Sequence, residues 1–303
     1  MTFQYTFKDL LGRAERITWR VEDLINDDKG LDFSKPFMPE GLARVKDLVF
    51  LSRDEQLKLN QIRGHAYLAI FGLVEEFILP FVLDHARPYI NGEDYRARAF
   101  LEFAAEEAKH IHLFRRFREA FTAGFGAACD VIGPPADIAA HVLSHPPLSV
   151  ALLTLHIEWM TQRHFQDSVS DDRDLDPQFK SLLLHHWMEE HQHAQLDTMM
   201  VRTIAEGMSE AEIQAGIEGY LALGGFLDEG LKQQALLDMA SLERATGSRF
   251  DEDQRAAFLD VQHQANRWTY IGSGMSHPKF IEMLGELSPA MRDTIQAAAP
   301  AFS

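Results

Sequence analysis

Two Glu-x-x-His sequences, each preceded by a single Glu about one helix hairpin upstream, constrain the fold of this chain more than any other feature. The two sequences are Glu107 with His110, and Glu190 with His193. Glu76 lies 31 residues before Glu107, and Glu158 lies 32 residues before Glu190. Such an interval accommodates a helix, a turn and an antiparallel helix that returns to the same height along a bundle. The spacing therefore predicts two helix pairs, each with one Glu on its first helix and Glu-x-x-His on its second.

The second Glu-x-x-His has a further candidate ligand one turn upstream, His186. His186, Glu190 and His193 stand at offsets of zero, four and seven. At about 100° per residue, their side chains fall within roughly 60° of one another on a helix. One isolated Glu-x-x-His is expected by chance in a chain of this length. Two copies, each with an upstream carboxylate at nearly the same interval, instead predict a two-metal site in a ferritin-like bundle.

The carboxylate of the first helix could come from either of two adjacent residues, Glu75 or Glu76. Residues 66–83 are apolar almost all round, so no polar face orients this helix. Around Glu76 and Glu158 alike, a Leu stands three residues before the Glu and an aromatic residue directly after it. This similarity favours Glu76, although Glu75 stays open. A buried carboxylate in so apolar a helix requires a cation or a metal as its partner.

The composition is that of an ordinary globular chain. Its 303 residues, 46% of them hydrophobic, suffice for one large domain. The net charge of −17 argues against nucleic acid and anionic membranes as partners, because both attract clusters of Lys and Arg. Cys129 is the only cysteine, which excludes a disulfide framework and a thiolate metal site within one chain. The first residues, Met1–Asp9, show no leader pattern, so we expect a cytoplasmic protein.

Helical periodicity dominates the sequence and strand signals are scarce, so we expect an all-α fold, a ferritin-like four-helix bundle with extra N- and C-terminal helices. We expect residues 1–303 to form a single domain, with the metal-binding core at about 55–206 and flanking helices at 1–54 and 207–303. The expected helices cover residues 6–26, a stretch capped by Ser52 that continues or breaks near Gly64, 94–123, 148–168, and a fourth metal helix ending near Gly207. Three or four more helices follow, interrupted at Gly224-Gly225, Gly247 and Pro278.

The residue types of the candidate ligands narrow the choice of metal. Carboxylates with two or three imidazoles and no thiolate suit iron or manganese better than copper or structural zinc. The sequence contains no His-Glu-x-x-His, no Gly-rich phosphate loop before a helix and no Gly-x-Ser-x-Gly. Other histidines near the motifs point away from the ligand positions and are expected at the surface or behind the ligands, namely His112, His164, His185 and His191. Asp197, one turn beyond His193, could orient a ligand or lie at the surface.

At these residues the chain resembles the p-aminobenzoate N-oxygenase family, AurF-like ferritin-fold enzymes in which a di-iron site uses O2 to oxidise an arylamine nitrogen. The resemblance covers about residues 15–205 and rests chiefly on His186, because the family adds a third imidazole one turn before the last Glu-x-x-His. It implies seven metal ligands, Glu76, Glu107, His110, Glu158, His186, Glu190 and His193. It also implies two Fe ions and O2 as co-substrate, while the ligand types suit a Mn/Fe pair as well. The di-iron centre itself would transfer oxygen to an amine through a peroxo-di-iron intermediate.

The resemblance further implies the partners of the protein. These are a small-molecule amine, free or carrier-bound, an external electron donor or reductase, and a second copy of the chain in a homodimer. Three alternatives stand beside it: a di-iron C-hydroxylase or desaturase, a ferritin-like protein that oxidises iron without an organic substrate, and a metal-free helical interaction module.

Overall fold

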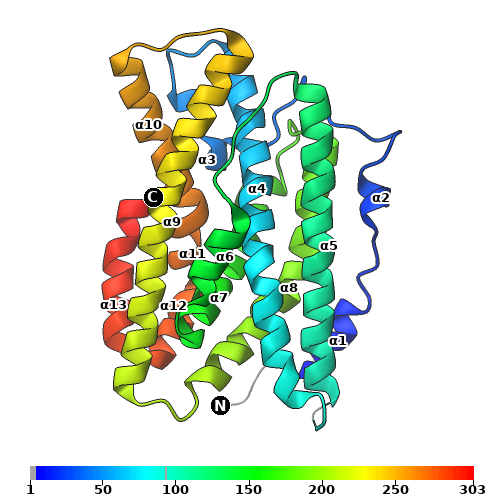
Figure 1. Cartoon of the computed structure of the whole chain (residues 1–303), viewed down its shortest axis with the longest axis vertical. Helices are drawn as coiled ribbons and strands as arrows, with labels where there is room; N and C mark the ends of the chain where they lie inside the picture. Colours follow the sequence, from blue (N-terminus) through cyan, green and yellow to red (C-terminus); the bar gives the residue numbers. More distant parts are fainter. Residues whose placement is uncertain (1–4, 93) are drawn as a thin grey trace.

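The computed structural model describes residues 5–92 and 94–303, which form helices joined by loops without a β-sheet (Figure 1). The helices are α1 (Phe7–Ala14), α2 (Val21–Leu24), α3 (Glu40–Ala43), α4 (Arg53–Ala86), α5 (Asp94–Phe125), α6 (Pro135–Leu143), α7 (Pro147–His164), α8 (Pro177–Ala205), α9 (Glu210–Thr246), α10 (Glu252–Arg267), α11 (Ser273–Met275), α12 (Pro278–Leu287) and α13 (Pro289–Ala298). Two π-helical segments, Phe165–Val169 and Trp268–Gly272, continue α7 and α10. The predicted all-α fold is confirmed.

Four of the long helices, α4, α5, α7 and α8, form the central bundle. α4 packs lengthwise against α5, α7 packs against α8, and contacts between α5 and α8 join the two pairs. In Figure 1, α4 and α5 stand side by side and meet at a short turn at their lower ends. The predicted bundle of two helix pairs with additional helices at both ends is thereby confirmed.

The first bundle helix begins where the sequence predicted and continues without a break. Ser52 accepts a hydrogen bond from the Glu55 backbone N–H at 3.3 Å, and the Glu55 carboxylate accepts one from the Ser52 N–H at 2.8 Å. This capping box satisfies backbone donors that a helix start leaves unpaired. Gly64 does not end the helix, because a Cβ there would lie 2.8 Å from Phe37 Cβ and 3.2 Å from the Phe179 ring. Gly64 therefore serves close packing inside a continuous α4.

The single helix predicted for residues 6–26 is wrong. The structure has two short helices, α1 and α2, joined by an irregular segment that runs along the outer side of α5 (Figure 1). In that segment Trp19 stacks on His110 with the ring planes 10° apart. The Lys109 ammonium lies 4.2 Å from the Trp19 ring centroid. These contacts with α5 compensate for the loss of the backbone hydrogen bonds that a continuous helix would have made.

The interruption predicted at Gly224-Gly225 is also wrong, because α9 runs through both residues. A glycine inside a helix costs about 1 kcal/mol relative to alanine. Packing of α9 against α4, α7 and α10 offsets that cost. The end predicted at Gly247 is present, since Gly247 has a φ of 76° and terminates α9 in the left-handed conformation that glycine adopts readily.

The stretch Arg53–Tyr89 is long and apolar enough, by length and composition, to cross a membrane. However, 67% of its most apolar window is buried inside the fold. A core helix of a large bundle has these properties, because neighbouring helices cover most of its surface. The burial of α4 is therefore explained by its contacts with α5, α6 and α9.

Candidate metal centre

Two groups of buried carboxylates and imidazoles lie inside the bundle. In each group the potential ligand atoms lie within 4.8 Å of one another. The first group is Glu75, His110, His186 and Glu190, and the second is Glu107, Glu158, Glu190 and His193. All four bundle helices contribute, and Glu190 belongs to both groups. The arrangement therefore has the form of a dinuclear site with one shared carboxylate.

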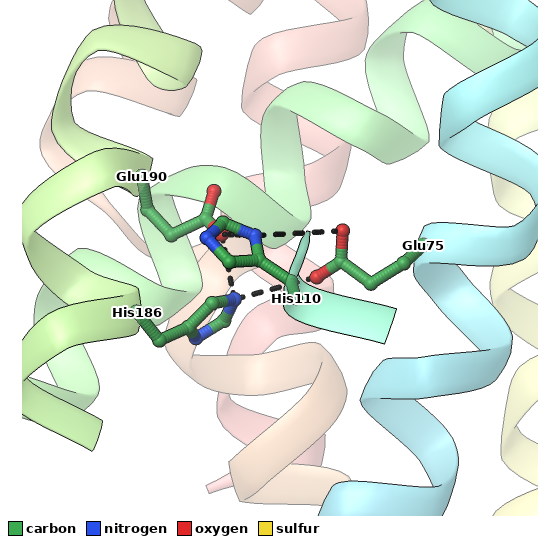
Figure 2. A group of neighbouring side chains, drawn as sticks. All are labelled: Glu75, His110, His186 and Glu190. Atoms are coloured by element: carbon green, nitrogen blue, oxygen red, sulfur yellow. Dashed lines mark hydrogen bonds and ion pairs between the residues drawn. The ribbon is translucent and has the colours of Figure 1, made fainter. Parts of the chain in front are cut away.

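The first group gathers around one oxygen of Glu190 (Figure 2). The His186 Nε2 atom lies 2.6 Å from Glu190 Oε1 and 3.3 Å from Glu75 Oε1. The His110 Nδ1 atom lies 3.2 Å from Glu190 Oε1 and 3.9 Å from Glu75 Oε2. Figure 2 shows Glu75 reaching from α4 toward the two imidazoles, which approach from α5 and α8. Two carboxylates and two imidazoles thus point at a common centre.

The second group gathers around the other oxygen of Glu190. The His193 Nδ1 atom lies 2.9 Å from Glu190 Oε2 and 3.0 Å from Glu107 Oε1. Glu158 on α7 completes this group and is 2% exposed. Because Glu190 offers Oε1 to one group and Oε2 to the other, its carboxylate can bridge two ions.

The preference for Glu76 over Glu75 is corrected by the structure. Glu75 is 3% exposed and faces the histidines, whereas Glu76 lies exposed on the outer side of α4. Adjacent residues on a helix differ in direction by about 100°, so only one of the two can face the bundle interior. The local similarity to the Glu158 stretch was misleading, because packing of the whole helix sets its rotation. The other six predicted ligands, Glu107, His110, Glu158, His186, Glu190 and His193, all lie in the two groups. Their role as ligands stays a prediction.

Two further carboxylates hold the imidazoles from behind. Glu189 Oε2 lies 2.8 Å from His110 Nε2, and Glu106 Oε2 lies 2.8 Å from His193 Nε2. Each carboxylate directly precedes a predicted ligand Glu on one helix and holds the imidazole of the other helix. These hydrogen bonds hold a proton on Nε2 of both rings and direct each Nδ1 into a ligand group, where Nδ1 can bind a metal once it has lost its own proton. The sequence feature that could have indicated these two supporting carboxylates is the first Glu of Glu-Glu-x-x-His, which occurs in both copies.

Lys109 balances one of these carboxylates. Its ammonium forms an ion pair with Glu189, whose carboxylate is fully buried. The Lys109 ammonium also lies over the Trp19 ring, which stacks on His110. The α1–α2 segment therefore closes the α5 side of the site.

Burial and mutual charge govern the acid–base state of the carboxylates. Burial, reinforced by the charge of Glu190, raises the pKa of Glu158 well above its usual range. Burial raises the pKa of Glu107 in the same direction. Burial acts likewise on Glu190, but the imidazoles of His186 and His193 outweigh it and the pKa of Glu190 lies well below its usual range. Protons and charged imidazoles thus compensate the carboxylates, and divalent cations can take their place.

The residues present fit two divalent ions. Several inward atoms are buried without a hydrogen-bond partner in the described structure, namely Glu75 Oε2, both oxygens of Glu107, Glu158 Oε2 and His110 Nδ1. Such orphaned groups are costly unless a cation binds them. Four carboxylates with neutral imidazoles also balance the charge of two divalent cations. Oxygen and nitrogen donors without thiolate suit Fe and Mn.

The remaining candidates take no place in the two groups. His112 is exposed, His185 and His191 are half-buried, and buried His164 lies 3.1 Å from the Tyr67 hydroxyl through its Nδ1 atom. Asp197 is fully buried, with neither oxygen hydrogen-bonded, and burial raises its pKa well above the usual range. Of the two roles predicted for Asp197, the surface position is wrong.

No protein-family model matches the sequence, and no curated protein matches it. Among solved structures, the chain is similar to R2-like ligand-binding oxidases. One mutant with an aerobically reconstituted Fe/Fe cofactor is 18% identical with a TM-score of 0.49, and the match covers 88% of this chain and 93% of that chain. Another mutant with an aerobically reconstituted Mn/Fe cofactor is 18% identical with a TM-score of 0.48 over 88% of this chain and 94% of that chain. A similarity at this level carries no functional argument. The AurF-like resemblance likewise stays a prediction.

Proposed function

We propose that this chain is an O2-dependent non-haem oxidoreductase whose dinuclear centre holds two Fe ions or a Mn/Fe pair. One observation carries the proposal: Glu190 directs one carboxylate oxygen into each of two fully buried groups of ligands. A metal with a purely structural role requires only one closed site. Two adjacent sites joined by a carboxylate allow two ions to act on one molecule.

The candidate ligands would bind the ions, and their burial would shield the ions from solvent. Glu75, His110 and His186 would hold one ion, Glu107, Glu158 and His193 the other, and Glu190 both. When bound, the redox-active ions supply the electrons for the reduction of O2. All seven side chains are at most 3% exposed, so the protein keeps bulk water away from the reaction. Glu106 and Glu189 keep two imidazoles in the tautomer that binds metal.

Within this class we propose that the reaction is N-oxygenation of an amine. The amine would be an arylamine or a related small molecule. The support is His186, which the resemblance marks as the distinguishing residue and whose Nε2 atom points into the first group. A neutral imidazole fills a coordination position without adding negative charge, which alters the charge at one ion. His186→Ala should therefore reduce metal loading at one ion or change reactivity toward O2.

Carbon hydroxylation or desaturation is the second candidate. An apolar cavity of about 720 Å³ lies against the outer faces of α4 and α7, the helices that carry Glu75 and Glu158. A protein that only oxidises iron does not need such a cavity. However, α4 and α7 separate this cavity from the ligand groups, so it supports the binding of an apolar molecule but not the reaction of that molecule at the centre.

The test combines metal analysis with anaerobic optical spectroscopy. The Fe-loaded protein is reduced, mixed with O2 and followed in the visible range with and without p-aminobenzoate. Two Fe per chain and a transient absorption that decays faster with the arylamine support N-oxygenation. Conversion to a ferric product at a rate that no amine changes argues for iron oxidation or another substrate, and a protein that binds no metal refutes the proposal.

We also propose, from the resemblance, that an external reductase supplies electrons and that the chain forms a homodimer. Sedimentation of the purified chain and co-purification of a reductase test these points separately from the reaction.

A further inference from the structure

A large cavity lies outside the metal centre, between the bundle and two covering helices. Its inner wall comes from α4 and α7, and its outer wall from α6 and α9. α4 and α7 have few direct contacts with each other, so α6 and α9 cover the space between them. In Figure 1, α6 lies between α4 and α9. The volume of about 720 Å³ falls within the range of ordinary ligand sites.

The inner wall is wholly apolar. α4 contributes Ile70, Leu73, Val74 and Phe77, which recur at helical spacing on one face, and α7 contributes Leu153 and Ile157. Each of these side chains is at most 9% exposed. Among the described residues, no charged side chain lines this wall, so an ion inside the cavity would be desolvated without a partner. The wall therefore accepts only the uncharged part of a ligand.

The charged side chains that line the cavity lie at its solvent-exposed opening, which is called the mouth below. Asp137, His141, Glu229 and Lys232 line the cavity but are exposed to solvent. Because acids and bases are mixed there, the mouth selects no particular head-group charge. A polar end of a ligand can stay hydrated at this position while the body enters the cavity.

The cavity is elongated along α9. Residues that line it extend from Leu223 to Leu236, a separation of roughly 20 Å along a helix axis. A single aromatic ring would fill only part of this length. A continuous apolar chain would cover it from the inner wall to the mouth, where Phe226 and Leu236 are 40% and 43% exposed.

We propose that this cavity binds one elongated apolar molecule, with an uncharged body along the inner wall and at most one polar end at the mouth. The bound molecule would lie one helix layer from the metal groups, because α4 and α7 present the cavity wall on one face and Glu75 and Glu158 on another. The proposal concerns binding, and its success does not depend on the reaction proposed above.

The test is calorimetric titration of the full-length chain, metal-free and Fe-loaded, with straight-chain alcohols from hexanol to tetradecanol. Each added methylene that enters the cavity should increase the affinity about three- to fourfold until the cavity is full. An affinity that reaches a plateau at one chain length, at one molecule per chain, is the expected result.

A matched pair of variants locates the binding site. Gly230 lines the cavity, and a Cβ there would meet only Ile132 Cδ1 at 3.7 Å, so the backbone has room for a side chain and Gly230→Leu adds apolar volume at the cavity. Gly225→Leu is the control on the same helix, since Gly225 is exposed, outside the lining and free of any atom within 4 Å of an added Cβ. We expect Gly230→Leu to reduce the length of the longest alcohol that binds and to lower the affinity for tetradecanol at least tenfold. Gly225→Leu should leave both quantities unchanged.

Three results would overturn the inference. They are no saturable binding of any chain, equal binding by the two variants, and self-association of the chain through the exposed apolar mouth without uptake of alcohol. Circular dichroism of both variants ensures that a loss of binding is not a loss of fold. Chain-length-dependent binding in a protein without O2 reactivity would leave this inference standing and refute the proposed function.

Discussion

Replacing Glu75 and Glu76 by Gln, one at a time, gives the sharpest test of the metal centre. Glu75 is 3% exposed and its Oε1 atom lies 3.3 Å from His186 Nε2, whereas Glu76 is exposed. Loss of a residue that merely supports a ligand weakens metal binding about 10- to 100-fold, so loss of a ligand should exceed about 100-fold. Glu76→Gln should leave metal binding unchanged.

The magnitude can be measured as thermal stability. A metal that binds only the folded chain stabilises it according to its affinity, and a loss of about 100-fold at excess metal removes about 2.7 kcal/mol. For a chain of 303 residues this lowers the melting temperature by about 4 °C, from the average unfolding entropy per residue. Melting of both variants with and without Fe(II) or Mn(II), together with metal analysis, provides the assay. The metal-free Glu75→Gln protein should melt within a few degrees of the wild type, because Gln can keep a hydrogen bond to His186.

An opposite pattern would refute the reasoning. If Glu76→Gln lost one metal per chain and Glu75→Gln kept both, the rotation of α4 described here would be wrong. If neither substitution changed metal content, α4 would provide no ligand and the two-pair arrangement would have to be abandoned.

Four further substitutions test helix packing, the carboxylates behind the ligands and one ion pair outside the site. Gly64→Ala should destabilise the fold by about 1–3 kcal/mol in chemical denaturation through overpacking, while Gly224→Ala, where an added Cβ meets nothing within 4 Å, should stabilise it by about 0.5–1 kcal/mol. Glu189→Gln should weaken metal binding about 10- to 100-fold in a chelator competition, with helix content unchanged. The hydrogen bond from Arg267 lowers the pKa of Asp228, so this pair stabilises the fold above the ordinary carboxyl range; Arg267→Ala should lower stability at neutral pH, and its difference from wild type should vanish as acid protonates Asp228.

Features that depend on the spacing of residues along one helix could be predicted from the sequence. The offsets of His186, Glu190 and His193 placed three side chains on one face, and the structure directs all three inward. The interval between Glu158 and Glu190 likewise predicted a hairpin, and α7 and α8 form it. Local patterns of this kind survive folding because a helix fixes relative directions regardless of its surroundings.

Features that depend on packing between helices could not be predicted in the same way. The rotation of α4 was ambiguous because its apolar residues surround it, and only its contacts with α5, α6 and α9 decide that Glu75 faces inward. The sequence left a break at Gly64 open and predicted one at Gly224-Gly225, yet packing outweighs the roughly 1 kcal/mol that each glycine costs. The cavity also arises between helices distant in sequence, so no local motif indicates it.

The two Glu-Glu-x-x-His sequences show how an inter-helical site can be encoded locally. On α5, Glu106 holds His193 of α8, and on α8, Glu189 holds His110 of α5. Each helix therefore positions an imidazole of the other, so neither histidine is held correctly unless both helices are docked in register. A rotation of either helix would break a buried hydrogen bond to a charged group, each worth about 1.5–3 kcal/mol. The same doubled motif that provides the candidate ligands thus also fixes the register of α5 against α8, which is the condition for Glu190 to face both ligand groups.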